Sequence, residues 1–145
     1  MQFVYPYTVK QSADGTWQVR FPDAPEALTE GESEAEAHAL AKDALLAALC
    51  GVCRLRRDLR GPSARKGRDV VVVPALQAAK LALYQAMREQ GLNNVTLARK
   101  LGKLGKLENE VRRMLDLDHE TKIGSLENAL WHLGKQMASE VREAA

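Results

Sequence analysis

The sequence lacks the features that mark membrane-spanning or exported chains. None of its apolar runs approaches the ~18 residues that a helix needs to cross a bilayer. Residues 1–5 lead directly into a strand pattern rather than a signal peptide. Hydrophobic residues make up 46% and charged residues 28% of the 145 residues, a balance too apolar for disorder. We therefore expect one or two small globular domains in the cytoplasm, with no membrane partner.

Cysteine is scarce, because only Cys50 and Cys53 are present and both lie within a helical pattern. A Cys-x-x-Cys pair can be a redox motif or half of a metal site, but a metal would need two more ligands nearby, and the sequence offers none beside them. We interpret the pair as small core or semi-exposed thiols in a reducing cytoplasm. The sequence therefore predicts no metal site and no cofactor.

Charge of one sign is not in excess overall, since the net charge is only +2. Its distribution along the chain is nevertheless uneven. Residues 1–49 carry three Lys or Arg against eight Asp or Glu, residues 54–68 carry seven against one, and residues 69–145 carry eleven against ten. An acidic front, a basic joint and a nearly neutral rear suggest parts with different partners.

The front of the chain predicts a β-hairpin. Apolar side chains alternate along two segments, namely Phe3, Tyr5, Tyr7 and Val9, then Trp17, Val19 and Phe21. The turn 12–15 between them ends in Gly15, which can adopt the positive φ that such a turn needs. We expect a short third strand at 27–29. The valine run 70–73, which Pro74 stops, predicts a further strand of the same sheet.

A long amphipathic helix should follow the third strand. Ser33 and Glu36 have the spacing of a capping box at its start. Behind them, one apolar stripe recurs at three- and four-residue steps: Ala37, Leu40, Ala41, Ala44, Leu45, Ala48, Leu49 and Val52. The fold class expected for the front is therefore α+β, with one helix packed on a mostly antiparallel sheet.

The same segment resembles the signature of the HicB antitoxin family. That signature is a strand ending in Phe-Pro-Asp-x-Pro, then Thr-x-Gly-x-Ser/Thr, then an acidic helix start, and residues 21–25 and 29–36 keep both its order and its spacing. The resemblance implies a partial ribonuclease-H-like fold without nuclease activity. It also implies a bacterial protein.

Catalysis is not expected from the front domain. Asp14, Asp23 and Asp43 are candidate carboxylates for a metal-dependent nuclease. Each has a simpler interpretation, because Asp14 shapes the turn, Asp23 shapes the loop and Asp43 lies on the solvent side of the helix. His38 is a lone helical histidine, and no set of nucleophile, base and orienting residue can be assembled. The chain is therefore predicted not to be an enzyme.

The basic joint at about 54–68 separates two expected domains, 1–73 and 74–145. Gly61-Pro62-Ser63 ends any helix there. Basic runs of this kind can touch nucleic acid, although most are solvated linkers.

Beyond the joint every apolar pattern is helical. Four short helices are predicted from four apolar sets: Leu76, Ala79, Leu83, Ala86 and Met87; Val95, Ala98, Leu101 and Leu104; Leu107, Val111, Met114 and Leu115; Ile123, Leu126, Leu130 and Leu133.

This rear half looks like the helix-turn-helix domain that some HicB proteins carry, on residues 79–89, 97–102 and 111–116. The resemblance favours DNA binding, whereas composition alone would favour a helical dimerisation domain with solvated charges. Residues 99–113 carry six cations against two acids. The residues expected to bind DNA are Asn94, Thr96, Arg99, Lys100, Lys103, Lys106, Asn109, Arg112 and Arg113.

One departure from the family pattern lies between the second and third rear helices. Leu-Gly occurs twice, at 101–102 and 104–105, so this segment is three residues longer than the family pattern. Three residues are close to one helical turn. Either the second helix runs one turn longer, or the turn bulges, and both outcomes could move the third helix relative to the groove.

The resemblance implies an antitoxin that binds a HicA-type mRNA-cleaving toxin and represses its own operon at operator DNA, as a homodimer or a higher even-numbered oligomer. The candidate toxin-binding residues are Phe21, Pro22, Asp23 and Pro25, which could equally be turn structure alone. The acidic charge of residues 1–49 suits a basic partner. The alternative is a stand-alone helix-turn-helix regulator whose front domain senses a small molecule.

Overall fold

The computed structural model describes residues 2–63, 69–102 and 106–144. The chain divides into two compact units. The first comprises Met1–Ala78 together with Asp116–Asp118, and the second comprises Ala79–Leu115 and His119–Ala145. None of the helices in this described part of the chain is long and apolar enough to cross a membrane.

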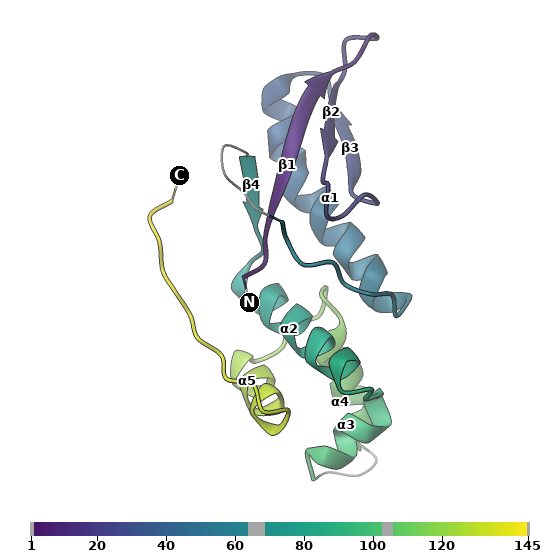
Figure 1. Cartoon of the computed structure of the whole chain (residues 1–145), viewed down its shortest axis with the longest axis vertical. Coiled ribbons are helices and arrows are strands. Elements are labelled where there is room, and N and C mark those ends of the chain that lie inside the picture. The colour runs from purple at the N-terminus through teal and green to yellow at the C-terminus, as the bar shows by residue number, and fades with distance from the viewer. Residues whose placement is uncertain (1, 64–68, 103–105, 145) are drawn as a thin grey trace. The chain divides into compact units, whose positions relative to one another are not determined.

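A four-stranded antiparallel sheet forms the centre of the first unit (Figure 1). Its strands are β1 (Val4–Gln11), β2 (Trp17–Arg20), β3 (Leu28–Gly31) and β4 (Asp69–Val72), in the order β3-β2-β1-β4. The predicted hairpin is confirmed, with Val9 opposite Val19. The valine run also joins this sheet as expected, because Val72 pairs with Val4 at the edge. The third strand begins one residue later than expected and continues to Gly31.

The hairpin turn is held by the carboxylate of Asp14. The Ser12 hydroxyl donates to Asp14 Oδ1 at 2.6 Å, and Thr16 donates to the same oxygen from its backbone N–H at 3.0 Å and its hydroxyl at 2.7 Å. Gly15 has φ of 87°, as the predicted turn requires. The bonds from Ser12 and Thr16 lower the pKa of Asp14 to about 2. The interpretation of Asp14 as a turn residue is confirmed.

Helix α1 (Glu34–Arg54) lies along one face of the sheet (Figure 1). Four of its buried side chains belong to the predicted stripe, namely Ala37, Ala41, Leu45 and Leu49, and Cys50, which was not part of that stripe, is buried beside them. On the sheet, the alternation that places Tyr5, Tyr7 and Val19 on one face also buries all three. The expected α+β architecture, with one helix packed on an antiparallel sheet, is therefore confirmed.

The start of α1 differs in one detail from the expected capping box. Ser33 Oγ accepts the backbone N–H of Glu36 at 3.1 Å, as predicted. The Glu36 carboxylate, however, accepts the N–H of Glu32 at 2.7 Å rather than that of Ser33. The backbone also passes very close here, since a Cβ added at Gly31 would lie 2.6 Å from the backbone nitrogen of Ala37. The end of β3 and the first turn of α1 therefore form one tightly packed corner.

Four helices make up the rest of the described chain, as the periodicity predicted. They are α2 (Ala75–Glu89), α3 (Asn94–Lys100), α4 (Lys106–Leu115) and α5 (Ile123–His132). The most deeply buried side chains of the second unit come from all four helices: Leu81, Leu83, Leu97, Val111 and Leu126. Residues 133–144 carry no regular structure.

Helix α3 corrects one expectation and excludes one of two alternatives that the sequence left open. Its inner face holds Leu97 and Ala98, whereas Val95, which was expected inside, is 47% exposed. The helix also does not run one turn longer, because it ends at Lys100 and Gly102 follows with φ of 74°. A positive φ ends the α-helical hydrogen-bond pattern, and glycine adopts it without strain. The rest of the apparent insertion, residues 103–105, lies outside the described residues.

Candidate functional sites

The loop after β2 holds the four residues that sequence reasoning assigned to toxin binding. Phe21 is only 2% exposed, and its ring lies 5.4 Å from that of Tyr7, so it belongs to the core. Pro22 and Pro25 are exposed, and Asp23 is half-buried. The loop therefore presents two prolines outward from a buried aromatic support.

Asp23 also fastens the basic joint to this loop. Its carboxylate accepts the backbone N–H and the hydroxyl of Ser63, both at 2.8 Å. Nearby, the hydroxyl of Tyr5 donates to the carbonyl of Arg60 at 3.0 Å. Burial, with contributions from Asp23 and Cys53, raises the pKa of Tyr5 to about 12. Residues 60–63 are thus held at two points against the sheet and the loop after β2.

The remaining candidate carboxylates take the positions expected of structural residues. Asp43 is exposed on α1, and Asp14 serves the hairpin turn. In the residues that the structure describes, neither of them joins Asp23 in a group that could hold a metal. His38 is half-buried and lies 2.7 Å, through Nδ1, from the Tyr7 hydroxyl. Its ring therefore supports the contact between α1 and β1.

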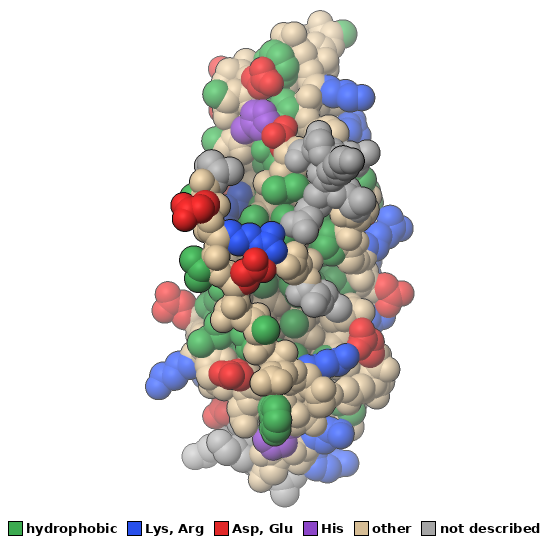
Figure 2. Space-filling view, turned by 60° about the vertical axis from the view of Figure 1, so that its left-hand side comes forward, with side chains coloured by type: hydrophobic (Ala, Val, Ile, Leu, Met, Phe, Trp, Pro, Cys, Tyr) green, Lys and Arg blue, Asp and Glu red, His purple; other side chains and the backbone are tan. Residues whose placement is uncertain are grey.

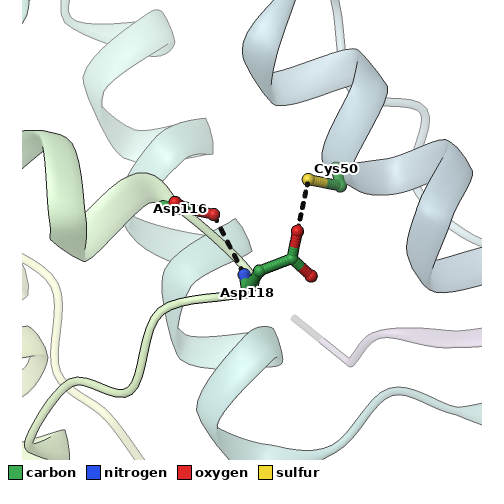
Figure 3. Close-up of side chains that lie close together, drawn as sticks. All are labelled: Cys50, Asp116 and Asp118. Atoms are coloured by element: carbon green, nitrogen blue, oxygen red, sulfur yellow. Dashed lines mark hydrogen bonds between the residues drawn. The ribbon is translucent and has the colours of Figure 1, made fainter.

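The structure brings two carboxylates to Cys50, one of the two cysteines for which the sequence showed no further ligand nearby. One ligand atom each from Cys50, Asp116 and Asp118 lies within 4.8 Å of the others (Figure 3). The Cys50 thiol donates to Asp118 Oδ2 at 3.7 Å, and the Arg54 guanidinium donates to the same carboxylate oxygen at 3.1 Å. Burial raises the pKa of both Cys50 and Cys53, the latter to about 12. A guanidinium already supplies positive charge at this cluster, and the thiols are protonated at neutral pH.

Two of the candidate DNA-binding residues lie in the first turn of α3. Asn94 is 9% exposed, and so is buried rather than open to a ligand. Thr96 completes a capping box with Asn93, in which the Asn93 side chain accepts the Thr96 N–H and Thr96 Oγ1 accepts the Asn93 N–H, both at 2.8 Å. These contacts fix the first turn of α3.

The other candidate DNA-binding residues that are described in full are open to solvent. Arg99 and Lys100 are exposed at the end of α3, and Asn109, Arg112 and Arg113 are exposed on α4. Lys103 lies outside the described residues, and Lys106 is the first residue of α4. On the face drawn in Figure 2, basic and acidic side chains are interspersed, so charge alone does not mark a binding surface there.

Sequence reasoning missed Lys80, a completely buried lysine on α2. Its ammonium donates to the backbone carbonyl of Arg113 at 3.0 Å and to that of His119. The signal was present in the spacing, because Lys80 lies four residues after Leu76 and three before Leu83, on the inner face of the predicted helix. Lysine is rarely fully buried, so a lysine at this position would normally be assigned to the exposed face of the helix.

Comparison with known proteins decides the family. Residues 4–82 match the family described as HicB_like antitoxin of bacterial toxin-antitoxin system. Antitoxin HicB 2 from Photorhabdus laumondii is 44% identical over 132 residues, which cover 90% of this chain and 92% of that protein. Antitoxin HicB from Escherichia coli K12 is 36% identical over 135 residues, 92% of this chain and 96% of that protein. The chain belongs to the HicB antitoxin family.

The similarity to HicB antitoxins extends through both units. The match to the family itself ends within α2, at residue 82. Antitoxin HicB from Pseudomonas fluorescens, by contrast, is 32% identical over 146 residues, which cover 99% of this chain and 97% of that protein. The helices after β4 are therefore part of what this chain has in common with HicB proteins.

Proposed function

We propose that this HicB chain neutralises a HicA-type, mRNA-cleaving toxin with its first unit and represses its own operon with its second. The observation that carries the proposal is the near full-length match to HicB antitoxins, because it includes both units in one chain. The protein acts by binding rather than by catalysis. A toxin and an operator are its two partners in this account.

The exposed prolines after β2 are the proposed centre of the toxin contact. Phe21 anchors this loop in the core, and Asp23 ties it to Ser63. A loop that is already fixed loses little conformational entropy when a partner binds. The excess of acidic residues before residue 50 favours approach of a basic protein. Pro22 and Pro25 would then meet the toxin directly.

A binding assay with paired variants tests this surface. The double variant Pro22→Ser and Pro25→Ser should bind the HicA-type toxin about tenfold more weakly, as expected when exposed apolar anchors at an interface are removed. Ala39→Ser, at an exposed position on α1, is the matched control and should bind normally. If the double variant bound as tightly as the control, the prolines would be loop structure and not toxin contacts.

Helices α3 and α4 are the proposed helix-turn-helix. In such a motif the second helix enters the major groove, and cationic and amide side chains on its outer face contact phosphates and base edges. The exposed side chains of Asn109, Arg112 and Arg113 on α4 suit these roles. Arg99 and Lys100, at the end of α3, suit phosphate contacts. A homodimer, or a higher even-numbered oligomer, would match a palindromic operator.

Salt dependence tests the DNA contact. Binding to the DNA upstream of the chain's own gene should weaken steeply with added salt, because phosphate contacts release counterions. Arg112→Ala should lower the slope of log affinity against log salt by about one. Arg142→Ala, in the segment after α5, removes a cation elsewhere and should leave the slope unchanged. Binding that is absent or insensitive to salt would contradict the proposal.

The alternative, a regulator with a ligand-sensing front domain, would need an apolar pocket there. A hollow of about 250 Å³ lies on β2 and β3. Small-molecule sites are usually larger, about 300–1,000 Å³. This hollow therefore does not favour the alternative.

A further inference from the structure

The buried ammonium of Lys80 is the feature of the second unit that packing alone does not require. Lys80 is 0% exposed, although lysine is almost never fully buried without partners. Placing an ammonium in an apolar interior is unfavourable unless hydrogen bonds replace its water. A leucine or methionine would fill the same space without that cost. The hydrogen bonds of the ammonium therefore explain why a lysine, and not an apolar residue, occupies this buried position.

Those contacts lie at the carboxyl end of α4. Arg113 belongs to the last turn of the helix, which ends at Leu115, so its carbonyl has no partner within the helix. Lys80 Nζ donates to that carbonyl at 3.0 Å, and it also donates to the carbonyl of His119 in the loop that follows. The carboxyl end of a helix carries partial negative charge, which favours a cation there. One ammonium thus fixes both the end of α4 and the start of the next loop to α2.

The end of α4 that Lys80 holds also carries side chains that are exposed to solvent. Arg113 has its backbone carbonyl held by Lys80 while its own side chain is exposed, and Arg112 and Asn109 are exposed on the same helix. Hydrogen bonds to base edges depend on heavy-atom distances within a few tenths of an ångström. Long arginine and lysine side chains adapt more easily when they only meet phosphates. The position of α4 therefore matters more for reading bases than for general attraction to DNA.

We propose that Lys80 is a positioning residue for operator recognition, whose buried ammonium holds the end of α4 where base contacts require it. This inference rests on the proposed DNA-binding function. It predicts that loss of the ammonium lowers affinity for the operator more than affinity for DNA of random sequence. A lysine that served folding alone would leave the ratio of the two affinities unchanged.

The experiment compares operator and random DNA of equal length for the full chain, under conditions where circular dichroism shows each variant folded. Lys80→Met should lower operator affinity about tenfold, as expected from losing the charge-assisted bonds to the carbonyls of Arg113 and His119. Affinity for random DNA should stay within about twofold, because it depends mainly on phosphate contacts. Leu130→Ala is the control, since it opens the core on α5 and leaves the Lys80 ammonium in place. It should lower the melting temperature and keep the affinity ratio.

Lys80→Gln, which retains an amide donor, replaces the methionine variant if that one does not fold. Equal losses on both DNAs, or an unchanged ratio, would overturn the proposal. If the wild-type chain itself did not prefer the operator, the proposed DNA-binding function would fail separately. Amide hydrogen exchange of the Lys80 variant is then compared with that of the wild-type chain. Faster exchange confined to α4 supports the positioning role. Faster exchange spread evenly over α3, α4 and α5 overturns it.

Discussion

The corner between β3 and α1 allows a sharp test of the packing of the first unit. A Cβ at Gly31 would lie 2.6 Å from the backbone nitrogen of Ala37, a distance that real Cβ atoms do not adopt. Because the obstacle is helix backbone and not a flexible side chain, the strand or the helix has to shift. Overpacking of this kind costs about 1–3 kcal/mol. Gly31→Ala should lower the free energy of unfolding of the first unit by that amount.

The same chemical change at Gly51 should have the opposite effect. Gly51 lies within α1, and a Cβ there would meet nothing within 4 Å. Alanine is a better helix former than glycine by about 0.5–1 kcal/mol. Gly51→Ala should therefore stabilise the first unit. The opposite signs of two Gly→Ala changes separate the close approach at the corner from any general effect of glycine.

Urea unfolding followed by tryptophan fluorescence measures both effects. Trp17 lies on β2 and reports on the first unit, whereas Trp131 lies on α5 and is 66% exposed. Both variants are best made with Trp131→Phe, so that only Trp17 contributes to the signal and the two units are not averaged. If Gly31→Ala matched the parent chain in stability, or stabilised it as Gly51→Ala should, the packing of this corner would be refuted.

Three further predictions follow from titratable and polar groups of the first unit. The pKa of Asp14 is lowered to about 2 from 3.8, so the contribution of this carboxylate to stability is complete above about pH 4 and is lost as the pH falls through 2. Titration of the carboxyl group by NMR checks this, and an ordinary aspartate pKa would contradict it. Burial raises the pKa of Cys53 to about 12, so this thiol should react with Ellman's reagent at pH 8 far more slowly in the folded chain than in urea, and equal rates would count against its burial. Asp23→Ala removes two hydrogen bonds to Ser63 and should destabilise the first unit by about 1 kcal/mol in the same urea assay, while an unchanged midpoint would show that the joint is not held there.

Much of the first unit could be predicted because its signals are local. Alternation of apolar residues defines β1 and β2, the valine run defines β4, and the stripe on α1 gives its buried face. Turn chemistry at Asp14 was equally local. The reciprocal contact of Glu36 was not, because two neighbouring backbone N–H groups lie within its reach and only the path of the chain decides between them.

The second unit shows where local patterns stop being informative. Helix α3 is only seven residues long, so Val95, Leu97 and Ala98 can be placed on an apolar face in more than one way. Packing buries Leu97 and leaves Val95 outside. Lys80 is a stronger case, because its burial depends on carbonyls 33 and 39 residues further along the chain. No window of sequence around Lys80 contains those partners.

The candidate site residues divide in the same way. The resemblance to HicB proteins points to the loop after β2 and to the cations of α4, but it does not separate side chains that face solvent from those that support the backbone. The structure makes that separation for Phe21, which is buried, and for Thr96, which caps α3. It leaves Pro22 and Arg112 exposed. Exposure is a property of the folded chain, and residue type alone does not determine it.

The central claim, that this HicB chain is the antitoxin of a HicA-type toxin, is tested most directly by RNA cleavage. A HicA-type toxin is purified, its cleavage of an mRNA is measured, and the full chain is added in increasing amounts. The account predicts that cleavage falls in proportion to the chain added and stops once every toxin molecule is bound. Cleavage that continues undiminished in a molar excess of folded chain would contradict it.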